Sequence, residues 1–312
     1  MKQPCVAVLM STYNGEQYIR EQIDSILNQK DVKVYLLIRD DGSKDNTPLI
    51  CKEYIDEYSN INFYQENNIG VGKSFMELLK VAPKVDYYAF ADQDDVWLED
   101  KLIRAVTNIE SIKEKCDKPV LYTSNQVLVD RNLNPYAMRF AKEPRHDLIQ
   151  EVVSNSLSGC TMVMDLSLRN IIIDKKNKPQ DYFLNTRLHD TWVMIVANIV
   201  GVIIYDDDSR ILYRQHERNV VGVKTLSFMQ KIKDKYTRFT SGKFLGNRSR
   251  LASFILRIFK EKLSIEQKDD LECLAECRSI FGAVKLLKNK KLKCAFNETD
   301  VMLFFRCVSS WL

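Results

Sequence analysis

The stretch YYAFADQDDVW, residues Tyr87–Trp97, joins an apolar run to a cluster of three carboxylates. Its first half predicts a buried strand, and Asp92, Asp94 and Asp95 follow at the carboxyl end of that strand. Carboxylates a few ångströms apart repel one another, which raises the pKa of one of them unless a cation lies among them. The pattern therefore indicates a divalent-metal site with the oxygen ligands that suit Mg²⁺ or Mn²⁺. An acidic turn before the next helix explains the same residues equally well when they are taken alone.

Strands and helices alternate along the first third of the chain. Apolar runs and helical spacing predict strands at 6–10, 33–39, 62–65 and 87–91, and helices at 16–29, 45–58 and 73–81. This order implies the α/β class, with a doubly wound, mostly parallel sheet. Ligands of such sheets bind outside the carboxyl ends of the strands. Four polar segments should therefore meet at one edge of the sheet: Ser11–Asn14, Asp40–Ser43, Asn67–Gly70 and Asp92–Asp95.

The later sequence is mixed and then becomes helical. We expect strands at 120–123, 125–129, 158–164, 201–205 and 211–213, with helices at 167–173 and 190–199. Beyond Gly222 the expected elements are all helices, at 226–237, 246–260, 266–288 and 298–309. The pattern divides the chain into a catalytic domain at 1–222 and a basic helical region at 223–312.

Composition places the chain among globular proteins. It has 312 residues, of which 45% are hydrophobic and 28% charged, and these are values typical of a soluble protein with one large domain or two smaller ones. No apolar run approaches the ~18–20 residues of a membrane-spanning helix, and the N-terminus lacks a signal-peptide pattern. The eight cysteines are scattered, which favours reduced thiols in a cytoplasmic protein.

The net charge of +4 conceals an asymmetry along the chain. Val223–Leu312 carries 19 Lys and Arg against 9 Asp and Glu, whereas the remainder carries 27 against 33. Within 244–263 a basic amphipathic helix predicts peripheral contact with an anionic membrane, through its apolar residues Leu251, Phe254, Ile255, Ile258 and Phe259. The alternative is packing on the catalytic domain or on a second subunit, as in a homodimer. No nucleic-acid module accompanies the charge, so nucleic-acid binding is not predicted.

Several single residues carry chemical hypotheses of their own. Asp41 follows a strand and can accept a hydrogen bond from a base or a ribose, while Tyr13 can stack on a base. Lys73 lies in a segment similar to the end of a phosphate-binding Walker loop, but Asn67 stands where that loop needs glycine, so we reject that interpretation. Asp190 suits either a helix N-cap or a catalytic base. Arg214 and His216 follow a strand and could serve a pyrophosphate and a metal.

The motifs together resemble family 2 glycosyltransferases of the GT-A fold. The similarity covers about 1–222 and rests on the four strand-end segments together with His189-Asp190. His189–Trp192 and Tyr213–Gly222 further resemble bacterial rhamnosyltransferases that build cell-wall or capsular polysaccharides. The resemblance implies an inverting glycosyltransferase, located in the cytoplasm and peripherally at the inner face of the bacterial plasma membrane.

The resemblance also implies a role for each matching residue. Asp190 would be the catalytic base, and the nucleotide sugar would be bound by Ser11, Tyr13, Asp41, Lys73, Asp92, Gln93 and Arg214. Mg²⁺ or Mn²⁺ would be held by Asp94, Asp92 and His216. The acceptor sugar would lie near Gly159, Cys160 and Trp192.

The implied reaction moves L-rhamnose from dTDP-rhamnose to a lipid-linked saccharide. A UDP-hexose donor such as UDP-glucose or UDP-galactose is the alternative within the same class of enzyme. A catalytically inactive nucleotide-sugar-binding protein is another, although it would not need Asp190. A metal-dependent nucleotidyltransferase would be expected to carry a Gly-rich basic loop, which Ser11–Asn14 is not.

Overall fold

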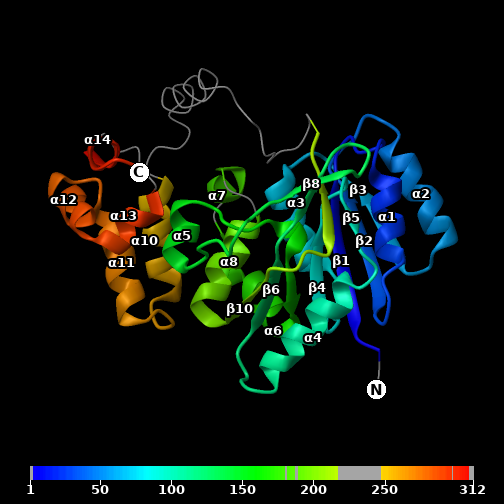
Figure 1. Cartoon of the computed structure of the whole chain (residues 1–312), viewed down its shortest axis with the longest axis horizontal. Coiled ribbons are helices and arrows are strands. Elements are labelled where there is room, and N and C mark those ends of the chain that lie inside the picture. The colour runs from blue at the N-terminus through cyan, green and yellow to red at the C-terminus, as the bar shows by residue number, and fades with distance from the viewer. Residues whose placement is uncertain (1–2, 180, 187–188, 217–246, 297, 309–312) are drawn as a thin grey trace. The chain divides into compact units, whose positions relative to one another are not determined.

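The computed structural model describes residues 3–179, 181–186, 189–216, 247–296 and 298–308 (Figure 1). The chain divides into two compact units. The first comprises Met1–Pro144 and Leu157–Gly222, and the second comprises Arg145–Ser156 and Val223–Leu312. The short stretch at 145–156 therefore belongs with the C-terminal region, although it is enclosed by the first unit in sequence.

A seven-stranded sheet forms the centre of the first unit, in the order β10-β6-β9-β4-β1-β2-β3. The strands are β1 (Cys5–Thr12), β2 (Lys33–Asp40), β3 (Ile61–Gln65), β4 (Tyr87–Ala91), β6 (Val120–Ser124), β9 (Val163–Asp165) and β10 (Val202–Asp206). Strands β1, β2, β3 and β4 are parallel to their neighbours in this group, and so are β6 and β10. The predicted mostly parallel α/β sheet is confirmed, and the four polar segments follow strands that end at the same edge.

Strand β9 runs against its neighbours. It pairs antiparallel with both β4 and β6, and Ala89 lies opposite Val163. The chain therefore enters β9 at the edge where β4 ends. The 3₁₀ turn η1 (Gly159–Thr161) precedes β9 and so lies beside the carboxylates that follow β4. The sequence predicts one continuous strand at 158–164, and this turn with its three-residue strand replaces it.

Helices cover both faces of the sheet, as a parallel sheet requires. Alternate residues of β1, such as Val6 and Val8, belong to one core with residues of α1 (Ile19–Leu27), α2 (Thr47–Glu57) and α4 (Lys101–Lys113). The other face is covered by α3 (Val71–Val81), α6 (Leu166–Ile173) and α8 (His189–Val200), with α7 (Asp181–Thr186) beside α3. Every residue from Val6 to Met10 is fully buried, which explains the continuous apolar run.

A second, four-stranded sheet has the order β5-β11-β7-β8. It contains β5 (Val96–Trp97), β7 (Val127–Val129), β8 (Pro135–Met138) and β11 (Ile211–Arg214). The sequence places two strands around a turn at 120–129, but β6 and β7 belong to different sheets. Strand β5 pairs with β11, which brings the end of β11 to the carboxylates before β5.

The second unit is built from helices. They are α5 (Leu148–Val153), α10 (Asn247–Phe259), α11 (Ile265–Glu276), α12 (Ile280–Lys288), α13 (Lys290–Phe296) and α14 (Asp300–Val308). The helix predicted at 266–288 is divided, because the Ser279 side chain caps α12 and a Cβ at Gly282 would lie 2.1 Å from the Glu276 carbonyl oxygen. The helix predicted at 226–237 lies outside the described residues.

The amphipathic helix predicted to lie on a membrane is α10, and its apolar face is not free. Leu251, Phe254, Ile255 and Phe259 are all buried. Helix α10 packs on α11 and α5, and Arg248 donates a hydrogen bond to the Val153 carbonyl at 2.8 Å. The prediction of membrane contact through this apolar face is therefore wrong, because the face forms the core of its own unit. Across the described residues, no helix is long and apolar enough to cross a membrane.

Candidate active site

One glutamine joins the loop after β4 to the loop after β1. The Gln93 side chain accepts a hydrogen bond from the Tyr13 N–H at 2.9 Å and donates one to the Tyr13 carbonyl at 3.1 Å. A Cβ at Gly15 would lie 2.3 Å from Gln93 Oε1, so this approach requires a residue without a side chain. Tyr13 is 48% exposed, so the residue is accessible for the predicted stacking on a base.

Asp41 is buried and holds the segment that leads into α3. Its carboxylate accepts hydrogen bonds from the backbone N–H groups of Ile69 and Gly70, each at 2.9 Å. The Arg39 guanidinium pairs with the same carboxylate at 2.5 Å. Gly70 has φ +87°, a conformation that favours glycine. Asp41 therefore shapes the backbone at this edge of the sheet, and contact with a base stays a prediction.

Ser11 extends this network to Ser74, the neighbour of Lys73 in the chain. The Ser11 hydroxyl donates to Ser74 Oγ at 2.6 Å, and the same oxygen accepts a hydrogen bond from Arg39 at 3.0 Å. Lys73 is partly buried in the first turn of α3. The start of α3 is thus tied to the ends of β1 and β2, where the sequence predicts the nucleotide.

Arg214, at the end of β11, supports the acidic loop from behind. It is 1% exposed, and its side chain donates to the carbonyls of Asp94 at 2.9 Å and Arg131 at 2.5 Å. The same guanidinium pairs with Glu21, while the Arg214 N–H donates to Asp95 Oδ1 at 3.1 Å. The guanidinium thus bonds to groups of the protein itself, and its contact with a diphosphate stays a prediction.

His216 lies against Asp94, another of the three predicted metal ligands. Its Nε2 lies 2.7 Å from Asp94 Oδ2, and its ring lies 5.0 Å from that of Tyr18, centroid to centroid. A carboxylate and an imidazole this close can share a proton or hold a cation together. Two of the three predicted metal ligands are therefore neighbours.

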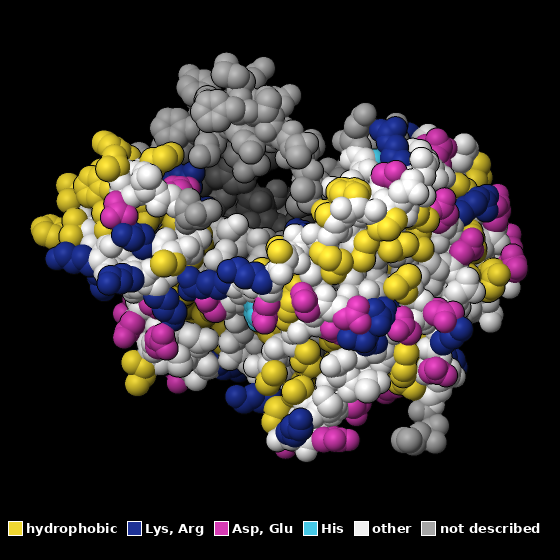
Figure 2. Space-filling view, viewed as in Figure 1, with side chains coloured by type: hydrophobic (Ala, Val, Ile, Leu, Met, Phe, Trp, Pro, Cys, Tyr) yellow, Lys and Arg dark blue, Asp and Glu magenta, His cyan; other side chains and the backbone are white. Residues whose placement is uncertain are grey.

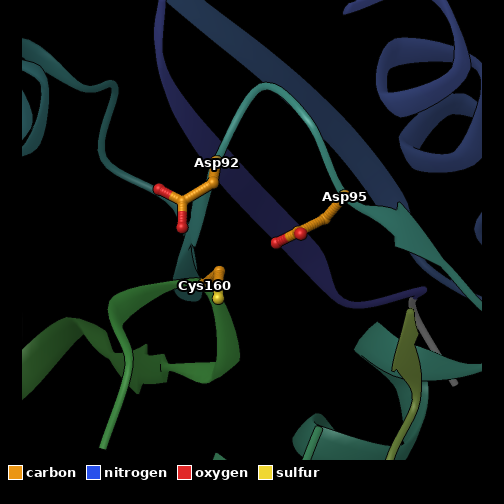
Figure 3. A group of neighbouring side chains, drawn as sticks. All are labelled: Asp92, Asp95 and Cys160. Carbon is orange, nitrogen blue, oxygen red and sulfur yellow. The ribbon is translucent and has the colours of Figure 1, made fainter. Parts of the chain in front are cut away.

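The remaining predicted ligand, Asp92, belongs to a second group with Asp95 and Cys160 (Figure 3). One ligand atom of each lies within 4.8 Å of the others, and in the picture the Asp95 carboxylate points toward the side where Asp92 and Cys160 lie. Burial and the charge of Asp94 raise the pKa of Asp92 to about 7. Burial also raises the pKa of Asp95 well above its ordinary value. This cluster is electrostatically costly without a cation.

A divalent cation fits this donor set. Among the described residues, no nitrogen or oxygen donor reaches the buried Asp95 Oδ2, so this carboxylate oxygen has no partner there. Burial raises the pKa of the Cys160 thiol well above its usual range, so the sulfur stays protonated and is a poor ligand. The available donors are carboxylate oxygens and the imidazole of His216, which suit Mg²⁺ or Mn²⁺.

The buried Lys101 ammonium group interacts with the charge of Asp95, and the sequence interpretation did not identify it. The side chain is 2% exposed, and Nζ lies 3.7 Å from the centroid of the Trp97 ring without a hydrogen-bond partner in the described chain. Burial lowers its pKa to about 8, and the charge of Asp95 opposes that shift. The available signal was its spacing, since Lys101 shares the apolar face of its helix with Ala105 and Ile109.

Arg139 is a second cation that the sequence interpretation did not identify. It donates to Gln126 Oε1 at 2.6 Å and bonds Ser158, and its charge lowers the pKa of Asp92. Gln126 in turn donates to Cys160 Sγ at 3.2 Å. Arg139 follows the exposed strand β8, where neither periodicity nor a motif marks it. No sequence signal distinguishes it from a surface arginine.

Asp190 lies within the same group of residues, at the start of α8. It is 4% exposed, and its charge contributes to the raised pKa of Asp92. A Cβ at Gly159 would lie 3.5 Å from Asp190 Cβ and 2.5 Å from His189 Nε2. The structure therefore brings the predicted base, the predicted acceptor turn and the acidic loop together, although they come from three distant parts of the chain.

The buried His189 side chain packs between Gly159 and two phenylalanine rings. Its ring stacks on Phe75 with centroids 4.0 Å apart and meets Phe90 edge-on at 4.6 Å. Burial lowers its pKa to about 3, so the imidazole is neutral at physiological pH. Trp192, one turn further along α8, is fully buried and packs against Phe183, with centroids 5.7 Å apart. Its predicted contact with an acceptor stays a prediction.

Comparisons with known proteins agree with this arrangement. The profile described as glycosyl transferase family 2 matches residues 7–172. The chain is 36% identical over 238 residues to the dTDP-rhamnosyl transferase RfbG of Shigella flexneri, covering 72% of this chain and 77% of that protein. It is 24% identical over 303 residues to the uncharacterized glycosyltransferase RT0329 of Rickettsia typhi, covering 96% and 86%.

A solved structure shares the fold. The crystal structure of S. aureus TarS 1-349 in complex with UDP-GlcNAc matches with a TM-score of 0.56 at 16% identity, covering 98% of this chain and 91% of that one. The GT-A fold inferred from the motifs is confirmed by this similarity. With the profile match and the similarity to RfbG, the chain belongs to glycosyl transferase family 2.

Proposed function

We propose that this protein transfers L-rhamnose from dTDP-rhamnose to a lipid-linked saccharide acceptor, with inversion of the anomeric centre, in surface polysaccharide synthesis. The observation that carries the proposal is the meeting of Asp190, Gly159 and Asp92 at the edge where the parallel strands end. A proton acceptor and an acidic loop at one site are what a single displacement at a sugar needs. The choice of rhamnose rests on the similarity to RfbG.

The residues divide the chemistry between them. An acceptor hydroxyl is a poor nucleophile, so Asp190 removes its proton as the oxygen attacks the anomeric carbon and the bond to the diphosphate breaks. Tyr13 stacks on the base, while Ser11, Asp41, Gln93 and Lys73 shape the nucleotide side of the site. Gly159 and Cys160 border the acceptor. Arg214 holds the backbone of Asp94 in place and acts as a positioning residue.

Asp92, Asp94 and His216 would hold Mg²⁺ or Mn²⁺, with Asp95 close behind them. A bound divalent cation would neutralise the negative charge that grows on the leaving diphosphate. In the structure Asp94 is paired with His216, whereas Asp92 groups with Asp95 and Cys160. A cation held by all three residues would therefore take ligands from both groups.

The donor is tested by incubating the protein with Mn²⁺ or Mg²⁺ and a panel of nucleotide sugars. Thermal stabilisation and slow hydrolysis should be largest for dTDP-rhamnose. A UDP-hexose is the competing donor, because the TarS structure of the same fold holds UDP-GlcNAc. Stabilisation by UDP sugars without an effect of dTDP-rhamnose would reverse the choice of donor. Binding of a donor without any transfer or hydrolysis would identify an inactive nucleotide-sugar-binding protein.

A further inference from the structure

Helices α12 and α14 of the second unit present an apolar face to the surface. The two helices pack against each other, and we call their outer side the α12–α14 face. Its exposed residues are Ile280, Phe281, Val284, Val301, Met302, Phe305 and Val308. Figure 2 shows hydrophobic side chains gathered over these helices, with Lys and Arg side chains beside them.

The apolar exposure on this face involves several large side chains. Phe281 is 89% exposed and Phe305 is 66% exposed. Helix α14 already contributes Leu303 and Cys307 to the core, so its outward side is a second apolar side. Residues at 301, 305 and 308 follow helical spacing along it. A contiguous apolar surface of this kind marks an interaction site.

The charge around the face is strongly of one sign. Residues 278–308 contain two acidic residues, Glu298 and Asp300, against seven basic ones: Arg278, Lys285, Lys288, Lys290, Lys291, Lys293 and Arg306. In the part of the chain that the structure describes, Arg278, Lys288 and Lys290 have no ion-pair partner. Lys288 lies one turn after Val284, on the same side of α12.

We propose that the α12–α14 face docks on a membrane surface that contains anionic lipids. The apolar side chains would enter the boundary between headgroups and acyl chains, and the unpaired basic groups would meet the lipid phosphates. A second copy of this chain fits less well, because a symmetric contact would place the same basic groups opposite one another. The inference rests on the proposed function for its meaning, since a lipid-linked acceptor is presented at such a surface.

The test is flotation of the full-length protein with vesicles of phosphatidylcholine, with or without phosphatidylglycerol. The wild type should float with the anionic vesicles alone, and less as salt is added. Phe281→Ser combined with Phe305→Ser should reduce the bound fraction on the order of tenfold. Lys288→Gln combined with Lys290→Gln should reduce it about 25-fold, since each basic group near an anionic leaflet changes the partition about fivefold.

Ile265→Ser is the matched control. Ile265 is 79% exposed and is the first residue of α11, outside the α12–α14 face. Its replacement should leave flotation unchanged. Thermal unfolding and dTDP-rhamnose hydrolysis of the same samples show folding and transferase activity separately from docking. Equal flotation of the wild type and the Phe281/Phe305 variant would overturn the proposal. Loss of a dimer in that variant, without vesicle binding by the wild type, would assign the face to a contact between copies.

Discussion

Asp94 and His216 are separated by 122 positions in the chain, yet Asp94 Oδ2 and His216 Nε2 lie 2.7 Å apart. The contact exists because β11 pairs with β5, the short strand directly after the acidic loop. The second sheet thus delivers an imidazole to carboxylates that the first sheet positions. A ligand that binds there contacts residues from both sheets, so the site depends on how the two sheets are placed relative to each other.

Replacing Asp190 with Asn should abolish transfer while leaving donor binding intact. The amide keeps the size of the side chain but cannot take a proton from the acceptor hydroxyl, and general-base catalysis contributes about 10²–10⁴ in rate. Initial rates of dTDP release with acceptor, together with donor affinity by calorimetry, measure the two effects. Near-normal transfer by a variant that binds donor normally would exclude Asp190 as the base.

Binding of Mn²⁺ should strengthen as the pH rises from 6 to 8. The pKa of Asp92 is raised from 3.8 to about 7, so between these pH values the native protein retains a proton that the unfolded chain has lost. The free energy of unfolding therefore falls as the pH rises from about 4 to about 7. The cation must displace this proton, which weakens binding by up to about tenfold per pH unit below the pKa.

Titration calorimetry at pH 6 and pH 8, in two buffers that differ in ionisation enthalpy, measures both affinity and proton release. The Asp92→Asn variant serves as the control, and its weaker binding should lose most of the pH dependence. Equal affinity of the wild type at the two pH values would show that Asp92 is already ionised.

Arg214→Lys should destabilise the protein by about 2–4 kcal/mol, because lysine cannot reach the separate acceptors that the guanidinium bonds and would leave buried groups unsatisfied. Urea unfolding provides the measurement. Arg20→Lys is the matched control, since the Arg20–Glu53 pair is exposed and its loss should cost less than about 1 kcal/mol. A similar small loss in both variants would contradict the supporting role of Arg214.

Gly159→Ala should destabilise the protein by about 1–3 kcal/mol and slow transfer. The new methyl group would meet His189 Nε2, and the imidazole has no room to retreat because Phe75 and Phe90 hold it. A double-mutant cycle with His189→Ala isolates the clash, as the double variant should be less destabilised than the sum of the single ones. Strict additivity would mean that the turn moves freely past the ring.

Much of the first unit could be predicted because its signals are local. Continuous apolar runs mark strands that are buried on both faces, so β1, β2 and β4 were located within two residues of their ends. The helix predicted at 45–58 agrees with α2 within two residues at each end. Its cap is less regular than the sequence suggests, because Asn46 holds the N-cap position without a side-chain cap bond while the Asp45 carboxylate accepts the Thr47 N–H at 3.0 Å.

The errors concern features that depend on distant partners. The direction of β9 is set by β4 and β6, and its three residues, Val163–Asp165, carry no sign of it. The burial of the apolar face of α10 depends on α5 and α11, so amphipathicity alone could not distinguish a core from a lipid surface. Arg139 approaches Asp92 only through the path of a loop. The role of Asp190 as the catalytic base was inferred from the family resemblance, because its place in the sequence alone suited a helix cap equally well.

The reversed direction of β9 has a consequence for redesign. Because that strand starts where β4 ends, the buried turn at Gly159–Thr161 can be altered without changing the path of any parallel strand. The turn proposed to border the acceptor and the segments Ser11–Asn14 and Asp40–Ser43, proposed to bind the nucleotide, are thus encoded in separate stretches of the chain. Substitutions confined to 157–162 should therefore change acceptor preference while donor choice is retained.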